Sequence, residues 1–208
     1  MDNPSDGPES REAGTVREVP PELMRGPFTV ARARELGVTR TVLAGARFRA
    51  PWPGVRVPAH LPDSLRLRCA AAELAIAREG RRPVFAGPTA VLLSRLPTPL
   101  RPIGAPAPDP LTEPLHVALP PDAPRPRLDG VIAHRLSLGP DEIRPLDGLL
   151  VTSPERTWRD LGAELDVIDL VALADAVRAR TPDGAARLRA QLAGARRGQV
   201  RLSRALGL

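Results

Sequence analysis

Residues 28–58 read FTVARARELGVTRTVLAGARFRAPWPGVRVP, and this stretch decides the expected fold of the N-terminal part of the chain. Thr29 and Thr39 each precede a segment whose apolar residues recur at helical spacing. A threonine in this position accepts a hydrogen bond from a free backbone N–H of the first turn, so both are expected N-caps. Gly37 separates the two segments and readily takes the left-handed conformation that ends a helix. The pattern predicts a helix-turn-helix.

The end of the same stretch predicts a β-hairpin. Residues 47–49 and 55–57 alternate between arginine and an apolar residue. A turn with proline and glycine, residues 51–54, lies between these runs, and this order is typical of a hairpin. A hairpin directly after a helix-turn-helix is a wing. We therefore expect residues 20–60 to form a winged helix-turn-helix domain, with residues 20–26 supplying its first helix.

The expected winged domain is strongly basic. It contains seven Arg and two Glu, a net charge of +5, and the phosphates of DNA attract such a surface. The side chains expected to reach base edges lie at the start of the second helix: Thr39, Arg40 and Thr41. Those expected to meet phosphates lie on or beside the wing: Arg47, Arg49 and Arg56. An ordinary helical hairpin with a solvated basic face remains the alternative.

The composition excludes several kinds of active site. The chain contains 30 arginines and no lysine. Every active site that depends on a lysine is therefore excluded, such as a phosphate-binding loop with Lys or a Schiff-base enzyme. The single cysteine, Cys69, lies in an apolar segment and is expected to fill the core, because one cysteine forms no internal disulfide. The sequence has no apolar run of membrane length and no signal peptide. We expect a cytoplasmic protein that does not associate with membranes.

Beyond the winged domain, the chain predicts an α+β fold with a small β-sheet and a mostly helical C-terminal half. Residues 1–19 are acidic and polar and are expected to be a disordered tail. Residues 61–208 are expected to form a second domain. Its expected strands are 115–119, 130–136 and 148–151. Its expected helices are 63–79, capped by Asp63, and 87–96, 154–161, 167–177, 182–192 and 197–206.

No group of residues in this second domain predicts catalysis. His116 and His134 lie on expected strands and could approach one another, but no third metal ligand has a suitable spacing. We expect both to be strand histidines whose neighbours satisfy them. No serine lies in a nucleophile elbow. The acidic residues between the later strands are expected to serve turns and caps: Asp141, Glu142 and Asp147. We expect no catalytic residue, no metal and no cofactor, and therefore no enzyme.

The order of several segments resembles a known family. These segments are FTVARARELGVTRTVL, RAPWPGVRVPA, FAGPTAVLLSRLP, GVIAHR and LLVTSPERTWRDLG. Over roughly residues 20–206 the chain resembles AbiEi-type antitoxins of type IV toxin–antitoxin systems and related N-terminal regions of high-GC bacterial proteins. The resemblance implies a winged helix that binds operator DNA, followed by an antitoxin domain. It also implies repression of the protein's own operon and a cognate nucleotidyltransferase-like toxin as partner.

Two other functions remain open at this point. Many relatives continue into a Vsr-like endonuclease domain, which is built around an Asp-Gly-x-x-His strand. Residues 129–134 only approximate this motif, so we expect the nuclease domain to be absent. The first alternative is therefore that the chain is the DNA-targeting part of a nuclease protein that lacks its nuclease domain. The second alternative is a protein-interaction scaffold that does not bind DNA. Its acidic region, residues 140–183, has ten acidic residues and five Arg, a net charge of −5, and would bind a basic partner.

Overall fold

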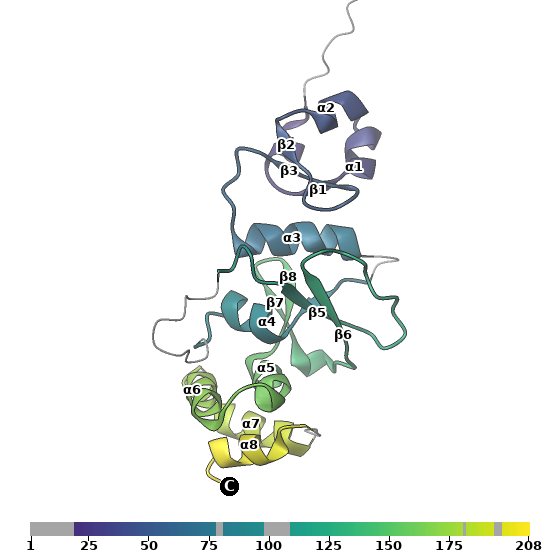
Figure 1. Cartoon of the computed structure of the whole chain (residues 1–208). Coiled ribbons are helices and arrows are strands. Elements are labelled where there is room, and N and C mark those ends of the chain that lie inside the picture. The colour runs from purple at the N-terminus through teal and green to yellow at the C-terminus, as the bar shows by residue number, and fades with distance from the viewer. Residues whose placement is uncertain (1–18, 78–80, 98–108, 181, 194–196) are drawn as a thin grey trace, which may run out of the picture.

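The computed structural model describes residues 19–77, 81–97, 109–180, 182–193 and 197–208 (Figure 1). It confirms the α+β class: a small N-terminal unit lies above helix α3, a mixed sheet follows, and a group of helices ends the chain (Figure 1). The expected tail, residues 1–19, lies outside the described residues except for Val19, which is buried.

The N-terminal unit contains short helices and a three-stranded sheet with the order β1-β3-β2. Its elements are η1 (Pro21–Met24), β1 (Phe28–Thr29), α1 (Val30–Glu35), α2 (Arg40–Ala44), β2 (Phe48–Arg49) and β3 (Val55–Pro58). Both expected caps are confirmed: the hydroxyl of Thr29 accepts from the N–H of Arg32 at 3.1 Å, and that of Thr39 from Val42 at 3.5 Å. Gly37 has a φ of 78° and ends α1 as expected.

The core of this unit is small and apolar. Phe28 and Phe48 meet edge to face with their ring centroids 5.3 Å apart, a favoured geometry for two aromatic rings. Ala33, Val38 and Leu43 are buried beside them. The small side chain of Ala33 allows α1 and α2 to approach, and Val38 and Leu43 belong to the same buried cluster.

The second sheet has five strands in the order β6-β5-β4-β8-β7. These strands are β4 (Val84–Phe85), β5 (Leu115–Leu119), β6 (Val131–Arg135), β7 (Ile143–Leu146) and β8 (Leu149–Thr152). Strands β5 and β6 are parallel, with Val117 opposite Ala133. Strand β7, an edge strand, was not predicted, since it contains Pro145, which cannot donate to a ladder. An edge position tolerates such a proline.

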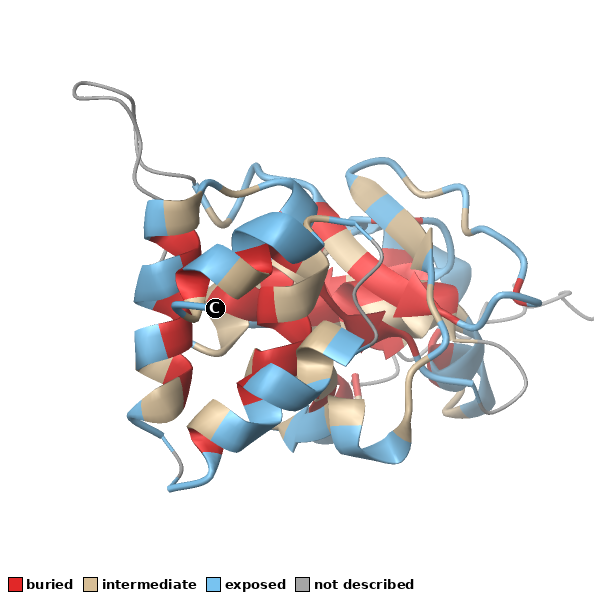
Figure 2. Ribbon diagram, turned by 90° about the horizontal axis from the view of Figure 1, so that it is seen from below, coloured by how far each residue is buried: buried red, intermediate tan, exposed pale blue. Residues whose placement is uncertain are grey.

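Helices cover this sheet and extend the chain beyond it. They are α3 (Leu65–Ile76), α4 (Gly87–Leu93), α5 (Pro154–Asp160), η3 (Leu161–Ala163), α6 (Val167–Arg178), α7 (Gly184–Ala193) and α8 (Gln199–Ala205). The expected cap of α3 was wrong by one residue: the hydroxyl of Ser64 accepts from the N–H of Leu67 at 3.1 Å, while Asp63 pairs with Arg49. The last helices bury their inward sides around Trp158 and expose the opposite sides (Figure 2).

The apolar core runs across the expected boundary at residues 60/61. Trp52, in the turn between β2 and β3, is buried and belongs to the same cluster as α3 and the five-stranded sheet. Its indole N–H donates to the carbonyl of Asp129 at 3.0 Å. Val55 and Val57 of β3 belong to this cluster too. The expected wing turn therefore anchors the N-terminal unit on the rest of the protein.

Replacing Trp52 tests this anchor. Trp52→Ala is expected to lower the free energy of unfolding by about 3–5 kcal/mol, because a large buried side chain is removed. Trp52→Phe keeps most of the apolar area and is expected to lose about 0.5–1.5 kcal/mol with the hydrogen bond. Urea denaturation followed by far-ultraviolet circular dichroism measures both. A loss below about 1 kcal/mol for Trp52→Ala would show that the anchor is dispensable.

Two glycines allow α8 to approach η3. A Cβ atom on Gly198 would lie 2.2 Å from the carbonyl carbon and oxygen of Gly162, and one on Gly162 would lie 2.6 Å from Leu202. Gly198 also has a φ of 73°, in the left-handed region. No larger residue fits at Gly198 unless the backbone moves.

Gly198→Ala is therefore expected to destabilise the protein more than the same change at Gly148. Gly148 has a φ of 86° but open space around it, so Gly148→Ala carries only the conformational cost of about 1–2 kcal/mol. Gly198→Ala adds a steric cost of about 1–3 kcal/mol. Equal losses of unfolding free energy in the two variants would contradict the close approach.

Candidate nucleic-acid interface

Helix α2 lies at the free end of the N-terminal unit, on the side opposite the C-terminal helices (Figure 1). Arg40 and Thr41 are exposed on its first turn. Thr39 is also exposed, and its hydroxyl caps the helix. The structure thus brings together the three residues that were expected to reach base edges and leaves them accessible.

Within the described part of the N-terminal unit, four exposed arginines make no hydrogen bond or ion pair through their guanidinium groups. They are Arg25, Arg34, Arg40 and Arg47. Arg25 and Arg34 were not among the predicted DNA contacts. Arg32 differs from them, because Glu22 at 3.5 Å and Glu35 at 3.3 Å neutralise it. The spacing of Arg32 and Glu35 would have revealed one of these pairs.

Arg49 and Arg56 are occupied inside the protein. Arg49 binds the carboxylate of Asp63 and donates to the carbonyl of Leu61 at 2.7 Å, which fastens β2 to the segment before α3. Arg56 donates to the carbonyls of Leu43 and Val55, each at 2.9 Å, and so satisfies an acceptor near the end of α2. Phosphate contacts through the same N–H groups of these two arginines would require these internal hydrogen bonds to break. The guanidinium groups of Arg40 and Arg47 have no internal hydrogen bonds to lose among the described residues.

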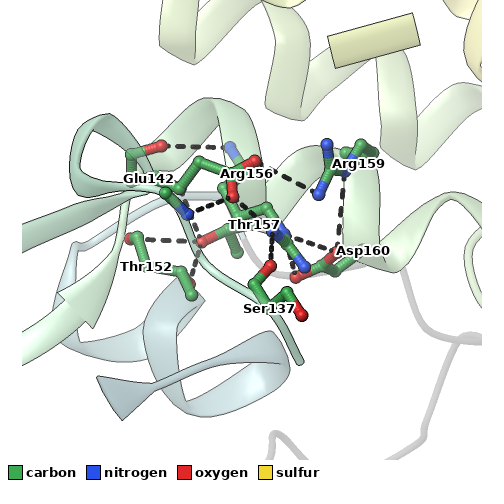
Figure 3. Close-up of polar contacts among 9 residues, drawn as sticks. Ser137, Glu142, Thr152, Arg156, Thr157, Arg159 and Asp160 are labelled. Carbon is green, nitrogen blue, oxygen red and sulfur yellow. Dashed lines mark hydrogen bonds and ion pairs between the residues drawn. The ribbon is translucent and has the colours of Figure 1, made fainter. Parts of the chain in front are cut away.

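A second group of charges lies at the start of α5, where Arg156 is buried and its partners are half-buried (Figure 3). The guanidinium of Arg156, whose side chain is 5% exposed, donates to Glu142 at 2.6 Å and to both oxygens of Asp160 at 2.8 and 2.9 Å. Arg159 reaches the other oxygen of Glu142 at 3.2 Å. Beside them, the hydroxyls of Thr152 and Thr157 lie 2.7 Å apart. This buried ion-pair cluster joins η2 (Pro140–Glu142) to α5.

The pKa values of the two carboxylates in this cluster shift in opposite directions. Burial raises the pKa of Asp160 above its usual 3.8, and the hydrogen bond and charge of Arg156 and the charge of Arg159 offset only part of this. Burial also raises the pKa of Glu142, but the N–H of Gly139 and the two arginines outweigh it and hold the pKa below 4.5. The position of Glu142 as a turn residue was predicted; its ion pairs were not. Of the ion pairs in this cluster, only that of Arg156 and Asp160 was predictable from the sequence, because the two residues lie four positions apart on one helix.

The other candidate chemical groups have structural surroundings. Burial raises the pKa of the Cys69 thiol to about 12, so the thiolate needed for reaction does not form near neutral pH. The expected approach of the two strand histidines is confirmed: Nδ1 of His116 lies 3.0 Å from Nε2 of His134. Among the described residues, no group of three or more His, Cys, Asp or Glu side chains is placed to hold a metal ion. In the same residues, no helix has the length and apolarity needed to cross a membrane.

Comparison with known proteins gives little further information. No protein-family model matches the chain, and no curated protein matches it. Its structure is similar to the crystal structure of the RV2827C protein from Mycobacterium tuberculosis, with 19% sequence identity and a TM-score of 0.41. The match covers 88% of this chain and 76% of that protein. A similarity of this degree carries no argument about function.

Glu142→Gln tests the buried ion-pair cluster. At neutral pH this change is expected to lower the free energy of unfolding by about 1.5–3 kcal/mol, because hydrogen bonds between charged groups are lost. Since folding lowers the pKa of Glu142, its ionised form stabilises the fold fully above pH 4.5, and this stabilisation disappears as the pH falls through the lower pKa of the folded state. The difference between the variant and the original protein should narrow below pH 4.5.

The neighbouring Asp141 is a matched control. It is exposed, and its carboxylate has no ion pair within the described residues. Asp141→Asn should change the unfolding free energy by less than about 0.5 kcal/mol at every pH. A pH-independent effect of Glu142→Gln would show that the charge of this residue does not matter.

Proposed function

We propose that this protein is a DNA-binding regulator in which residues 20–60 act as a winged helix-turn-helix. The observation that carries the proposal is the exposed first turn of α2, with Thr39, Arg40 and Thr41 accessible and further unpaired arginines exposed in the same described unit. Arginine donates two parallel hydrogen bonds to guanine in the major groove, and threonine contacts either kind of base pair. Arg40 is the residue we assign to base recognition.

Non-specific affinity would come from the remaining unpaired arginines. Arg25, Arg34 and Arg47 are exposed, so their guanidinium groups reach phosphates without losing an internal partner. Phosphate contacts from these three arginines would give a salt slope of roughly −2.7, equivalent to about a 40-fold loss of affinity between 50 and 200 mM salt. Arg49 and Arg56 would contribute mainly by holding the unit together.

We further propose an antitoxin-like role. The resemblance to AbiEi-type antitoxins in five segments supports autoregulation of an operon and a nucleotidyltransferase-like toxin as partner. In this proposal the five-stranded sheet and helices α5–α8 form the antitoxin domain. The anchor at Trp52 would fix the orientation of the DNA-binding unit relative to that domain, because its indole N–H bonds to Asp129.

The test is a mobility-shift titration of the full chain against the promoter of its own gene and against shuffled DNA, at two salt concentrations. The proposal expects preference for the promoter. Arg40→Ala should weaken promoter binding by about 1–3 kcal/mol and bring it closer to the shuffled DNA. Arg47→Ala should weaken both DNAs alike and reduce the salt slope by about 0.9.

Arg135→Ala is the matched control. Arg135 is exposed on β6, so the change removes one positive charge from a distant surface and should leave both titrations unchanged. Equal effects of Arg40→Ala on the two DNAs would refute base recognition by α2. Absence of any binding by the original protein would refute the whole proposal.

A further inference from the structure

A small apolar pocket lies between α4, β5 and η3, away from the N-terminal unit. Its volume is about 190 Å³. Val91, Leu115 and Leu161 form its buried walls, and each is at most 3% exposed. At about 30 Å³ per water molecule, this space equals roughly six waters. It suits one ring or a short branched chain and is too small for a nucleotide.

His116 lines one wall of the pocket. Its backbone N–H donates to the hydroxyl of Thr89 at 2.8 Å, and its Nδ1 bonds to Nε2 of His134 at 3.0 Å. Gly87 lies against the ring, since a Cβ there would be 3.6 Å from Nδ1. These contacts hold the ring in place, and its Nε2 has no partner within the part of the chain that the structure describes.

The charged residues that line the pocket are acidic. Glu113 and Glu164 line it and are exposed, and neither carboxylate forms an ion pair with another described residue. No arginine lines the pocket, although Arg68 reaches the backbone carbonyl of Glu113 from outside at 3.2 Å. Burial and the nearby His134 lower the pKa of His116, so this imidazole is neutral near pH 7 and does not repel a cation.

We propose that this pocket binds a small amphipathic amine, with the apolar body of the ligand against Val91, Leu115 and Leu161 and its ammonium group between Glu113 and Glu164. The free Nε2 of His116 accepts a hydrogen bond from the ligand in the tautomer whose Nδ1–H donates to Nε2 of His134. The proposal does not depend on DNA binding, because no residue of the pocket belongs to the N-terminal unit.

Three probes of similar shape and different charge test it: benzylamine, benzyl alcohol and benzoate. Binding to the full chain is followed by calorimetry and by the amide and imidazole signals in nuclear magnetic resonance. Benzylamine should bind about fivefold more tightly than benzyl alcohol, which corresponds to two exposed ion pairs. It should shift the signals of Thr89, Leu115 and His116, and benzoate should not bind.

The double variant Glu113→Gln, Glu164→Gln should abolish the preference for benzylamine over benzyl alcohol while keeping the same shifted signals. The matched control is Glu22→Gln, Glu35→Gln, which removes two exposed glutamates from the N-terminal unit and should keep the preference. Equal binding of the three probes, signal changes elsewhere, or no binding of benzylamine would overturn the proposal. The single variant Glu164→Gln, expected to halve the preference, provides an independent check.

Discussion

The insertion of Trp52 into the core of the second sheet is the contact on which the arrangement of the molecule depends. A turn between two short strands exposes its side chains unless something covers them, yet this indole is buried and its N–H is satisfied by Asp129. The turn therefore cannot project freely, as the wing of an isolated winged helix would. Helix α3 and the strand β3 share one apolar cluster, while the first turn of α2 stays exposed.

The arginines of this chain divide into two kinds by their partners. Arg49, Arg56 and Arg156 donate to carbonyls or carboxylates within the protein, which replaces hydration that their guanidinium groups lose on burial. The Nε of Arg49 is the exception, since it is buried without a partner among the described residues. Arg40 and Arg47 keep their water and have no such partner. Only the second kind is available to an external anion without a structural cost. A net charge counted over residues 20–60 cannot make this distinction, which is why the expected phosphate contacts did not all remain free.

Local features were predictable because their causes are local. The caps by Thr29 and Thr39 and the turn at Gly37 depend on residues within three or four positions. Strand β7 escaped prediction because its proline is tolerated only at an edge, and the edge is a property of the whole sheet. The two-residue strand β1 escaped for a similar reason, since it exists only through its pairing with β3. The ion pairs of Glu142 join segments fourteen residues apart and more, so no helical spacing announced them.

The amino-acid sequence alone was enough to predict the α+β class, the positions of most helices and strands, and the net charge of +5 in residues 20–60. These follow from hydrophobic periodicity, capping residues and composition. Periodicity and capping depend on residues close together in the sequence, and composition does not depend on residue order. The tertiary structure alone decided which charges are free, that the expected wing turn is an anchor, and that His116 lines a pocket beside two glutamates. These properties arise where distant segments exclude water from one another, and burial of that kind is not encoded at any single position.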